Sequence, residues 1–168
     1  LANRVLVADF EDAGSIEHLF WRVGSPADRV AQCAEVVKAS GPTIVFCRTK
    51  RRTDRIARDL DRAGIRTAAI HGARSQGQRD RALASFADGN VEALVATDVA
   101  ARGIHVDAVA CVVHFDPPND AKDYTHRSGR TARAGATGLV VSLVDQEQKN
   151  AVAALQRALK LPVGVEAP

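Results

Sequence analysis

The sequence contains no methionine, has only three cysteines and is poor in aromatic residues, which make up 4% of its 168 residues. No stretch approaches about 18 uninterrupted apolar residues, the length that a membrane-spanning helix needs, so no membrane segment is predicted. The N-terminus also lacks the basic and then apolar pattern of a secretory signal. Because the sequence begins at Leu1 and carries no methionine, we expect it to be part of a longer chain.

The three cysteines, Cys33, Cys47 and Cys111, are odd in number and lie far apart in the sequence. They form no C-x-x-C pair, so the sequence predicts neither a zinc site nor a disulfide framework. Free cysteines are typical of a reducing compartment. We therefore expect a cytoplasmic location, and we assign no metal ligands to this chain.

Apolar and charged residues are both plentiful, at 46% and 26% of the sequence, a balance that suits one globular domain and excludes a disordered chain. The net charge is +3, and 18 of the 23 basic residues are arginine. The guanidinium group presents a planar set of donors that matches phosphate and carboxylate, so this excess indicates contacts with a polyanion. A general codon preference explains the composition equally well, so the positions of the arginines must decide.

Helical patterns bounded by caps alternate with short runs of β-branched residues. Ser25 and Pro26 read as the start of the first helix, and Gly64 as the end of the second. Ser75 and Gln78 form a capping box for the third helix. Strands are expected at residues 16–23, 43–47, 67–70, 93–96, 110–114 and 139–144. This alternation predicts an α/β sandwich with a central, mainly parallel sheet.

The ends of the sequence show weaker patterns than its middle. Asp145 is expected to cap a last helix, which Pro162 would end. We interpret residues 1–14 as a linker remnant, residues 15–162 as the domain and residues 163–168 as a tail remnant.

Basic residues gather in the segments that directly follow the expected strands. These segments are CRTKRR (47–52), HGARSQGQR (71–79), TDVAARGIH (97–105) and DYTHRSGRTARAG (123–135). In an open parallel sheet, ligands bind beyond the carboxyl ends of the strands. The arginine excess is therefore concentrated where a binding site is expected.

The densest basic cluster is HRSGRTARAG, residues 126–135. Arg127, Arg130 and Arg133 recur every three residues, and on a helical turn they would share roughly one face. Three like charges on one face need a phosphate chain or a set of carboxylates as counter-charge. A solvated basic face is the alternative, although Gly129 is a poor choice for a helix that serves solubility alone.

HRSGRTARAG closely resembles motif VI of the DEAD-box RNA helicases, H-R-x-G-R-x-x-R. ATDVAARGI (96–104) resembles their motif V, SQGQR (75–79) contains the Q-x-x-R of motif IVa, and IVFCRTKRR (44–52) resembles motif IV. The four motifs occur in the family's order over about residues 16–160. The resemblance implies the family's second, C-terminal RecA-like domain, a three-layer α/β sandwich, from a protein that unwinds or remodels RNA with ATP.

The motifs of the family's first domain are missing from this sequence. It contains no Gly-Lys-Ser/Thr loop to hold phosphates and no D-E-A-D run to hold magnesium. The resemblance therefore implies ATP and Mg²⁺ as cofactors, with Mg²⁺ held by an N-terminal RecA-like domain of the same parent chain. RNA and that domain are the expected partners, and this chain alone is expected not to hydrolyse ATP.

The resemblance also implies roles for the residues of motif VI. Arg130 and Arg133 would be catalytic arginine fingers that reach across the cleft to ATP, a contribution worth roughly 10³ to 10⁵ in rate. His126, Arg127 and Gly129 would contact ATP or the N-terminal domain.

Motif V carries one departure from the family and one expected ion pair. The family usually has an aspartate after A-R-G-[LI], where it binds the ATP ribose, and this sequence has His105. Asp107 could take that role only if the loop is rearranged. We expect Asp98 and Arg102 to form an internal ion pair that shapes the motif V loop.

The contacts with RNA are implied by the same resemblance. The residues expected along the sugar-phosphate track are Thr49, Gly72, Gln76, Arg79, Thr97 and Gly103. Hydroxyls, glycine amides and arginine suit backbone contacts that do not read base sequence. For Gln76, capping of its own helix is a further expected role.

Three other interpretations remain open at this point. Cys47 ends a buried strand before a basic loop, as in cysteine phosphatases, but Arg52 falls one position short of C-x-x-x-x-x-R. A DNA-directed superfamily 2 helicase is a second alternative, although His126 favours the DEAD-box branch over the glutamine of many translocases. A non-catalytic module that binds RNA or protein is the third.

Overall fold

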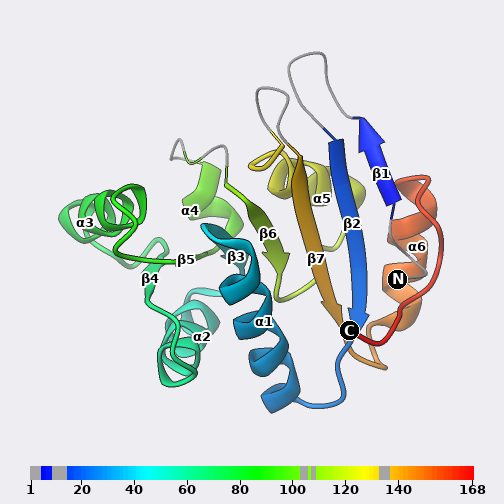
Figure 1. Cartoon of the computed structure of the whole chain (residues 1–168), viewed down its shortest axis with the longest axis horizontal. Helices are drawn as coiled ribbons and strands as arrows, with labels where there is room; N and C mark the ends of the chain where they lie inside the picture. Colours follow the sequence, from blue (N-terminus) through cyan, green and yellow to red (C-terminus); the bar gives the residue numbers. More distant parts are fainter. Residues whose placement is uncertain (1–4, 9–14, 103–105, 107–108, 133–136) are drawn as a thin grey trace.

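A seven-stranded sheet forms the centre of the computed structural model, which describes residues 5–8, 15–102, 106, 109–132 and 137–168 (Figure 1). The strand order is β1-β2-β7-β6-β3-β5-β4. Six strands are parallel: β2 (Ser15–Arg22), β3 (Thr43–Phe46), β4 (Thr67–Ile70), β5 (Ala93–Ala96), β6 (Cys111–His114) and β7 (Gly138–Val144). The predicted, mainly parallel α/β sheet is confirmed.

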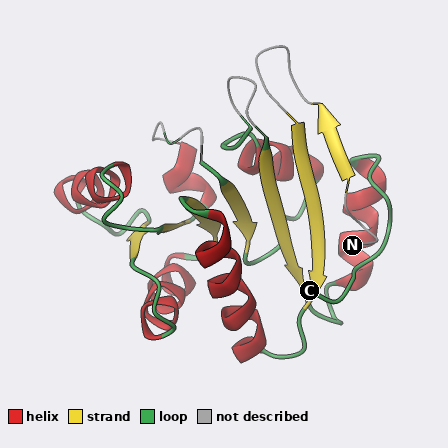
Figure 2. Cartoon of the chain, in the orientation of Figure 1, coloured by secondary structure: helices red, strands yellow, loops and turns green. Residues whose placement is uncertain are grey.

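Helices cover both faces of this sheet (Figure 2). On one face lie α1 (Pro26–Ser40) and α2 (Lys50–Arg62), which bury Val37 and Leu60 against the strands. The opposite face carries α3 (Gln76–Ala87), α4 (Asp98–Arg102), α5 (Ala121–Ser128) and α6 (Lys149–Ala158). The central strands are buried on both faces, because β3, β5 and β6 expose none of their residues. Among the described residues, no helix combines the length and hydrophobicity that crossing a membrane requires.

The predicted caps are largely confirmed. Ser25 accepts a hydrogen bond from the backbone N–H of Asp28, and the capping box of Ser75 and Gln78 is complete. The last helix differs, because α6 begins only at Lys149. Asp145 instead accepts from the backbone N–H of Gln148 at 2.9 Å and so closes the turn that precedes α6.

Two segments near the ends of the sequence, Val5–Ala8 and the region of Glu166, pair with the outer edge of β2, although we interpreted them as parts of a linker and a tail. Strand β1 (Val5–Ala8) pairs antiparallel with residues 15–18. Farther along the same edge, the backbone of Glu166 donates to Phe20 at 3.0 Å and accepts from Arg22 at 2.8 Å. The sequence of β1, VLVA, is a short apolar run that is typical of a strand, although we interpreted residues 1–14 as a linker remnant, and no such run precedes Glu166.

Candidate nucleotide and nucleic-acid interface

The loops that follow the parallel strands meet at one edge of the sheet, as expected. The backbone N–H of Arg48, after β3, donates to Asp116, after β6, at 2.8 Å. A Cβ atom built on Gly72, after β4, would lie 3.2 Å from Cε of Lys50 at the start of α2. The segments resembling motifs IV, IVa, V and VI are therefore brought to one region by the strand order β6-β3-β5-β4.

Asp98 forms its ion pair with Arg127 rather than with Arg102. Nε and Nη2 of Arg127 donate to the two carboxylate oxygens of Asp98 at 2.6 and 2.8 Å. Arg102 instead lies 3.3 Å from Asp123 of α5 and is mostly exposed. The predicted pair of Asp98 and Arg102 is therefore wrong, because the fold offers each of them a partner from another part of the chain.

Arg127 is buried inside this domain, which contradicts the expected contact with a neighbouring domain. Only 5% of its surface is exposed. Besides Asp98, its Nη1 donates to the backbone oxygen of Asp116 at 2.8 Å and lies 3.2 Å from Nδ1 of His114. Its guanidinium also lies over the ring of Phe46, 5.2 Å from the centroid. Arg127 thus joins motif V, motif VI and strand β6.

Three buried side chains with polar rings, His114, Tyr124 and His18, contact one another in series beside Arg127. His114 stacks on Tyr124 with ring centroids 4.6 Å apart, and the Tyr124 hydroxyl lies 2.7 Å from Nδ1 of His18. Burial lowers the pKa of His114, and the positive charge of Arg127 lowers it further. Because an arginine can only donate, Nδ1 of His114 must accept from it. Sequence reasoning missed these three residues, since each lies in an apolar run or between motif positions.

Arg130 lies beyond the end of α5, so the predicted helical face with three arginines does not form. The helix ends at Ser128, and Gly129 follows as its C-cap. Arg130 is half-buried, and its Nη2 donates to the backbone oxygen of Ala101 at 2.9 Å. With the exposed His126 it lines a shallow depression between α4 and α5. Predicted site residues Arg133, His105, Asp107 and Gly103 lie outside the described residues.

Three of the residues expected to bind RNA are exposed near the start of α2 and α3. Thr49 caps α2 by accepting from the backbone N–H of Arg52, and its hydroxyl can still donate. Gly72 follows β4, and Gln76 opens α3. The Gln76 amide donates to Asp80 at 2.8 Å, so it does not serve as the cap that we also expected.

The other two described residues of that set are less accessible. Arg79 is half-buried on the first turn of α3. Thr97 is only 7% exposed, and its hydroxyl accepts from the backbone N–H of Ala100 at 3.4 Å at the start of α4. Thr97 therefore shapes the beginning of motif V, whatever else it contacts.

Cys47 is not placed to act as a nucleophile. It is fully buried, and burial raises the pKa of its thiol well above the ordinary value. Arg52, the arginine considered for a phosphatase loop, instead donates to both carboxylate oxygens of Asp116 at 2.8 and 2.7 Å. The structure thus argues against the cysteine phosphatase alternative.

Comparison with known proteins identifies the family. Residues 28–135 match the helicase conserved C-terminal domain. DEAD-box ATP-dependent RNA helicase 46 of Arabidopsis thaliana is 45% identical over 131 residues, 76% of this chain and 20% of that protein. The chain thus spans about a fifth of the length of the first relatives that it matches.

Solved structures agree with this match. The E. coli DEAD-box protein SrmB, bound to regulator of ribonuclease activity A, aligns with a TM-score of 0.82 and 32% identity over 95% of this chain and 92% of that one. S. cerevisiae Dbp5, bound to RNA and ADP BeF3, aligns with a TM-score of 0.80 and 30% identity over 91% of this chain and 41% of that one. The expected RecA-like sandwich is confirmed, and the chain belongs to the DEAD-box family as its helicase C-terminal domain.

Proposed function

We propose that this chain is the C-terminal half of an ATP-dependent RNA helicase whose parent protein unwinds or remodels RNA with ATP. The observation that carries the proposal is that Arg130 and the exposed His126 line a shallow depression beside the buried pair of Asp98 and Arg127. The names of the relatives and the Dbp5 complex with RNA and ADP BeF3 support it. Free, buried cysteines fit a reducing compartment, so we also propose the cytoplasm.

In this proposal, Arg130 acts on a nucleotide held by the N-terminal domain. Nη2, at the tip of its side chain, donates to the backbone oxygen of Ala101 and so holds the guanidinium beside α4, and the Asp98–Arg127 pair joins α4 to α5 in the same region. When ATP is bound, phosphoryl transfer develops negative charge that a positioned guanidinium stabilises. Arg130 and Arg133 would supply that charge, and His126 and Gly129 would face the same cleft. We assign Mg²⁺ to the N-terminal domain, as the missing phosphate and D-E-A-D motifs imply.

The ribose contact is the least conventional part of this proposal. His105 stands where the family carries an aspartate. A carboxylate can only accept hydrogen bonds from the ribose hydroxyls, whereas a neutral imidazole has one nitrogen that donates and one that accepts. We propose that His105, or Asp107 beside it, faces the ATP ribose.

The RNA path would run along the carboxyl edge of β3, β4 and β5. Thr49, Gly72 and Gln76 are exposed there and offer a hydroxyl, backbone amides and a side-chain amide. These groups hold a sugar-phosphate backbone without reading its sequence. Arg79, Thr97 and Gly103 would complete this path.

The test is ATP turnover in the parent protein. Changing Arg130 to Ala should lower RNA-stimulated turnover by roughly 10³-fold, because the finger's charge is lost from the transition state. Arg157→Ala, on the far helix α6, is the matched control and should turn over normally. Near-normal turnover of the Arg130 variant would contradict the finger role.

Two further measurements separate this proposal from its alternatives. The 168-residue chain alone should show no ATPase activity, so turnover by a clean preparation would contradict a half-motor. Equal stimulation of the parent by DNA and RNA would favour a DNA-directed helicase. Absence of any turnover in the parent would favour a non-catalytic module.

A further inference from the structure

The outer face of α2 carries a continuous row of arginines. The α2 arginine row consists of Arg51, Arg55, Arg58 and Arg62. At about 100° per residue, these four positions fall within an arc of about 60°, and the row is about 16 Å long. All four are exposed, whereas the helix buries Thr53, Ile56, Ala57 and Leu60 on its opposite side. The row therefore points directly into solvent.

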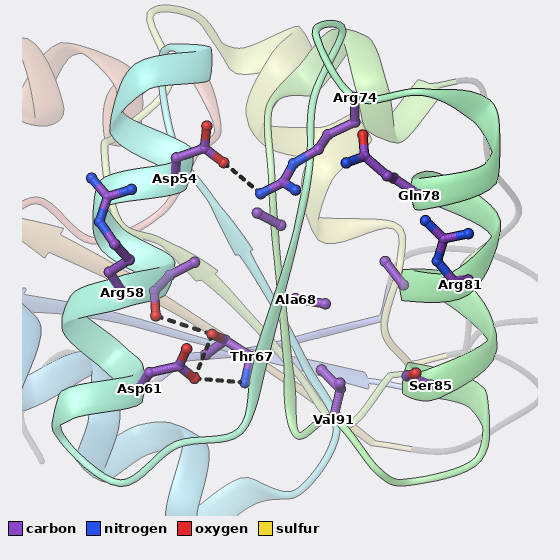
Figure 3. A pocket seen from close by; sticks show the side chains of 13 residues that line it. Asp54, Arg58, Asp61, Thr67, Ala68, Arg74, Gln78, Arg81, Ser85 and Val91 are labelled. Atoms are coloured by element: carbon purple, nitrogen blue, oxygen red, sulfur yellow. Dashed lines mark hydrogen bonds and ion pairs between the residues drawn. The ribbon is translucent and has the colours of Figure 1, made fainter.

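Two of the three acidic residues of α2, Asp54 and Asp61, are engaged on the flanks of this row and form no ion pair with it. Asp54 binds His71 and Arg74 at 3.0 and 2.9 Å. Asp61 accepts from the backbone N–H and the hydroxyl of Thr67, and in Figure 3 its carboxylate turns toward β4, whereas Arg58 extends away from that strand.

Among the described residues, only the last member of the row forms an ion pair with a carboxylate. Arg62 lies 3.4 Å from Asp59. Within the described part of the chain, no carboxylate lies within ion-pair distance of Arg51, Arg55 or Arg58. Across the residues that the structure describes, these three neighbouring positive charges have no paired carboxylate, which is unfavourable unless a ligand supplies a counter-charge.

Other helices of this chain show that the row is not a simple result of arginine-rich composition. The exposed positions of α1 are Pro26, Ala27, Ala31, Glu35, Lys38 and Ala39. Those of α6 are Lys149, Asn150, Ala151, Ala154, Arg157 and Ala158. A codon preference would act on all three helices alike. The concentration of arginine therefore belongs to the position of α2 in the fold.

That position connects the row to the proposed RNA path. α2 begins directly after Thr49, and Lys50 at its first turn touches the segment at Gly72. The row starts within one turn of this edge and runs away from it along the helix. A polyanion that leaves the edge at Thr49 would meet Arg51 first and then the rest of the row.

We propose that the α2 arginine row is a second phosphate-binding surface that lengthens the RNA path beyond the motif residues. The proposal rests on the proposed function, because the row continues the path assigned there. RNA is favoured over an acidic protein because the row is continuous with that path. Arginine side chains alone, without exposed aromatic rings on this face, suit backbone contacts that do not select sequence.

The test is binding of single-stranded RNA by this chain, as a function of salt. The row variant carries Arg51→Gln, Arg55→Gln and Arg58→Gln, and the control carries Lys149→Gln, Arg157→Gln and Lys160→Gln, with the same loss of charge. The row variant should bind a long strand roughly tenfold more weakly at low salt, with a salt slope shallower by about 2 than wild type. The control should keep the wild-type slope. Equal behaviour of the two variants would overturn the proposal.

Two further binding measurements distinguish the proposal for the α2 arginine row from the proposed RNA path on which it rests. A strand too short to leave the edge should bind the row variant and the wild type equally, whereas Gln76→Ala with Arg79→Ala should weaken binding of both strands. If only that edge variant loses affinity, the row proposal fails alone. If neither variant loses affinity, the RNA path itself is wrong. Loss of polyglutamate binding by the row variant, with RNA binding intact, would instead assign the row to an acidic protein and overturn the RNA proposal.

Discussion

Arg127 and Asp98 form a bidentate ion pair, in which Nε and Nη2 of the guanidinium donate to the two carboxylate oxygens at 2.6 and 2.8 Å. The two residues are 29 positions apart and come from α5 and from the start of α4. Their pairing places motif VI against motif V inside one domain. A side chain that the family resemblance assigns to contacts with a neighbouring domain therefore joins two motifs within this domain.

Removal of this pair should destabilise the fold strongly. Arg127→Ala should lower the free energy of unfolding by about 3 kcal/mol or more, because it leaves the Asp98 carboxylate without its partner. Arg127→Lys should restore only part of that loss, since an ammonium cannot form the two parallel bonds. Urea unfolding measures both. Arg102→Ala should cost less than about 1 kcal/mol, since its pair with Asp123 is exposed, and a larger loss there would restore the original pairing prediction.

The three cysteines should not react in the native protein. Each is buried, and burial raises the pKa of all three thiols, that of Cys111 to about 12. Labelling with Ellman's reagent should therefore proceed only as fast as the chain opens, and should become complete in denaturant. Rapid labelling of Cys47 without denaturant, or hydrolysis of p-nitrophenyl phosphate, would revive the phosphatase alternative.

Stability should fall when the solution is acidified below neutral pH. Burial lowers the pKa of His18 to about 4, whereas an unfolded histidine titrates near about 6.5. Between these values the unfolded chain holds a proton that the native state does not, so the free energy of unfolding rises with pH. His18 alone should make the protein about 2 kcal/mol less stable at about pH 5 than at about pH 7.

The buried histidines can be tested by substitution. His18→Gln keeps an amide opposite the Tyr124 hydroxyl and cannot titrate, so its unfolding free energy should depend less on pH than that of wild type. Burial also lowers the pKa of His114, which contributes in the same direction. Urea unfolding across this pH range measures the effect, and an unchanged slope in the variant would exclude His18 as its source.

The buried side chain of Gln156 should contribute to holding the C-terminal segment in place. Gln156 is fully buried, and its amide donates to Gly164 at 2.8 Å and accepts from it at 3.1 Å. Gln156→Ala should cost about 2 kcal/mol, because two hydrogen bonds are lost and the backbone at Gly164 is released. The backbone N–H of Arg22, which donates to Glu166, should then exchange with deuterium faster. Unchanged exchange at Arg22 would show that the segment docks without Gln156.

Six of the strands and four of the helices could be predicted from the sequence because their signals are local, whereas β1, α4 and α5 were not predicted. The strand at residues 67–70 and the capping box at Ser75 and Gln78 occur where the pattern places them. The three-residue spacing of the arginines suggested a shared helical face, whereas α5 ends at Ser128 with Gly129 as its C-cap. The motif residues were identified through their family resemblance, and the fold brings the described ones to one edge of the sheet.

Partner choice could not be read from spacing. Asp98 and Arg102 stand four residues apart, a spacing that favours a local pair. The sheet, however, places β5 and β6 on either side of β3. The segments that follow these strands therefore lie close together, and Arg127 binds both Asp98 and the backbone of Asp116. The sequence by itself determined where helices and strands begin and which residues carry charge, because capping and periodicity act within a few residues. Only the tertiary structure decided which charges are buried and paired and which, like the α2 arginine row, face the solvent, because burial depends on segments that are distant in the chain.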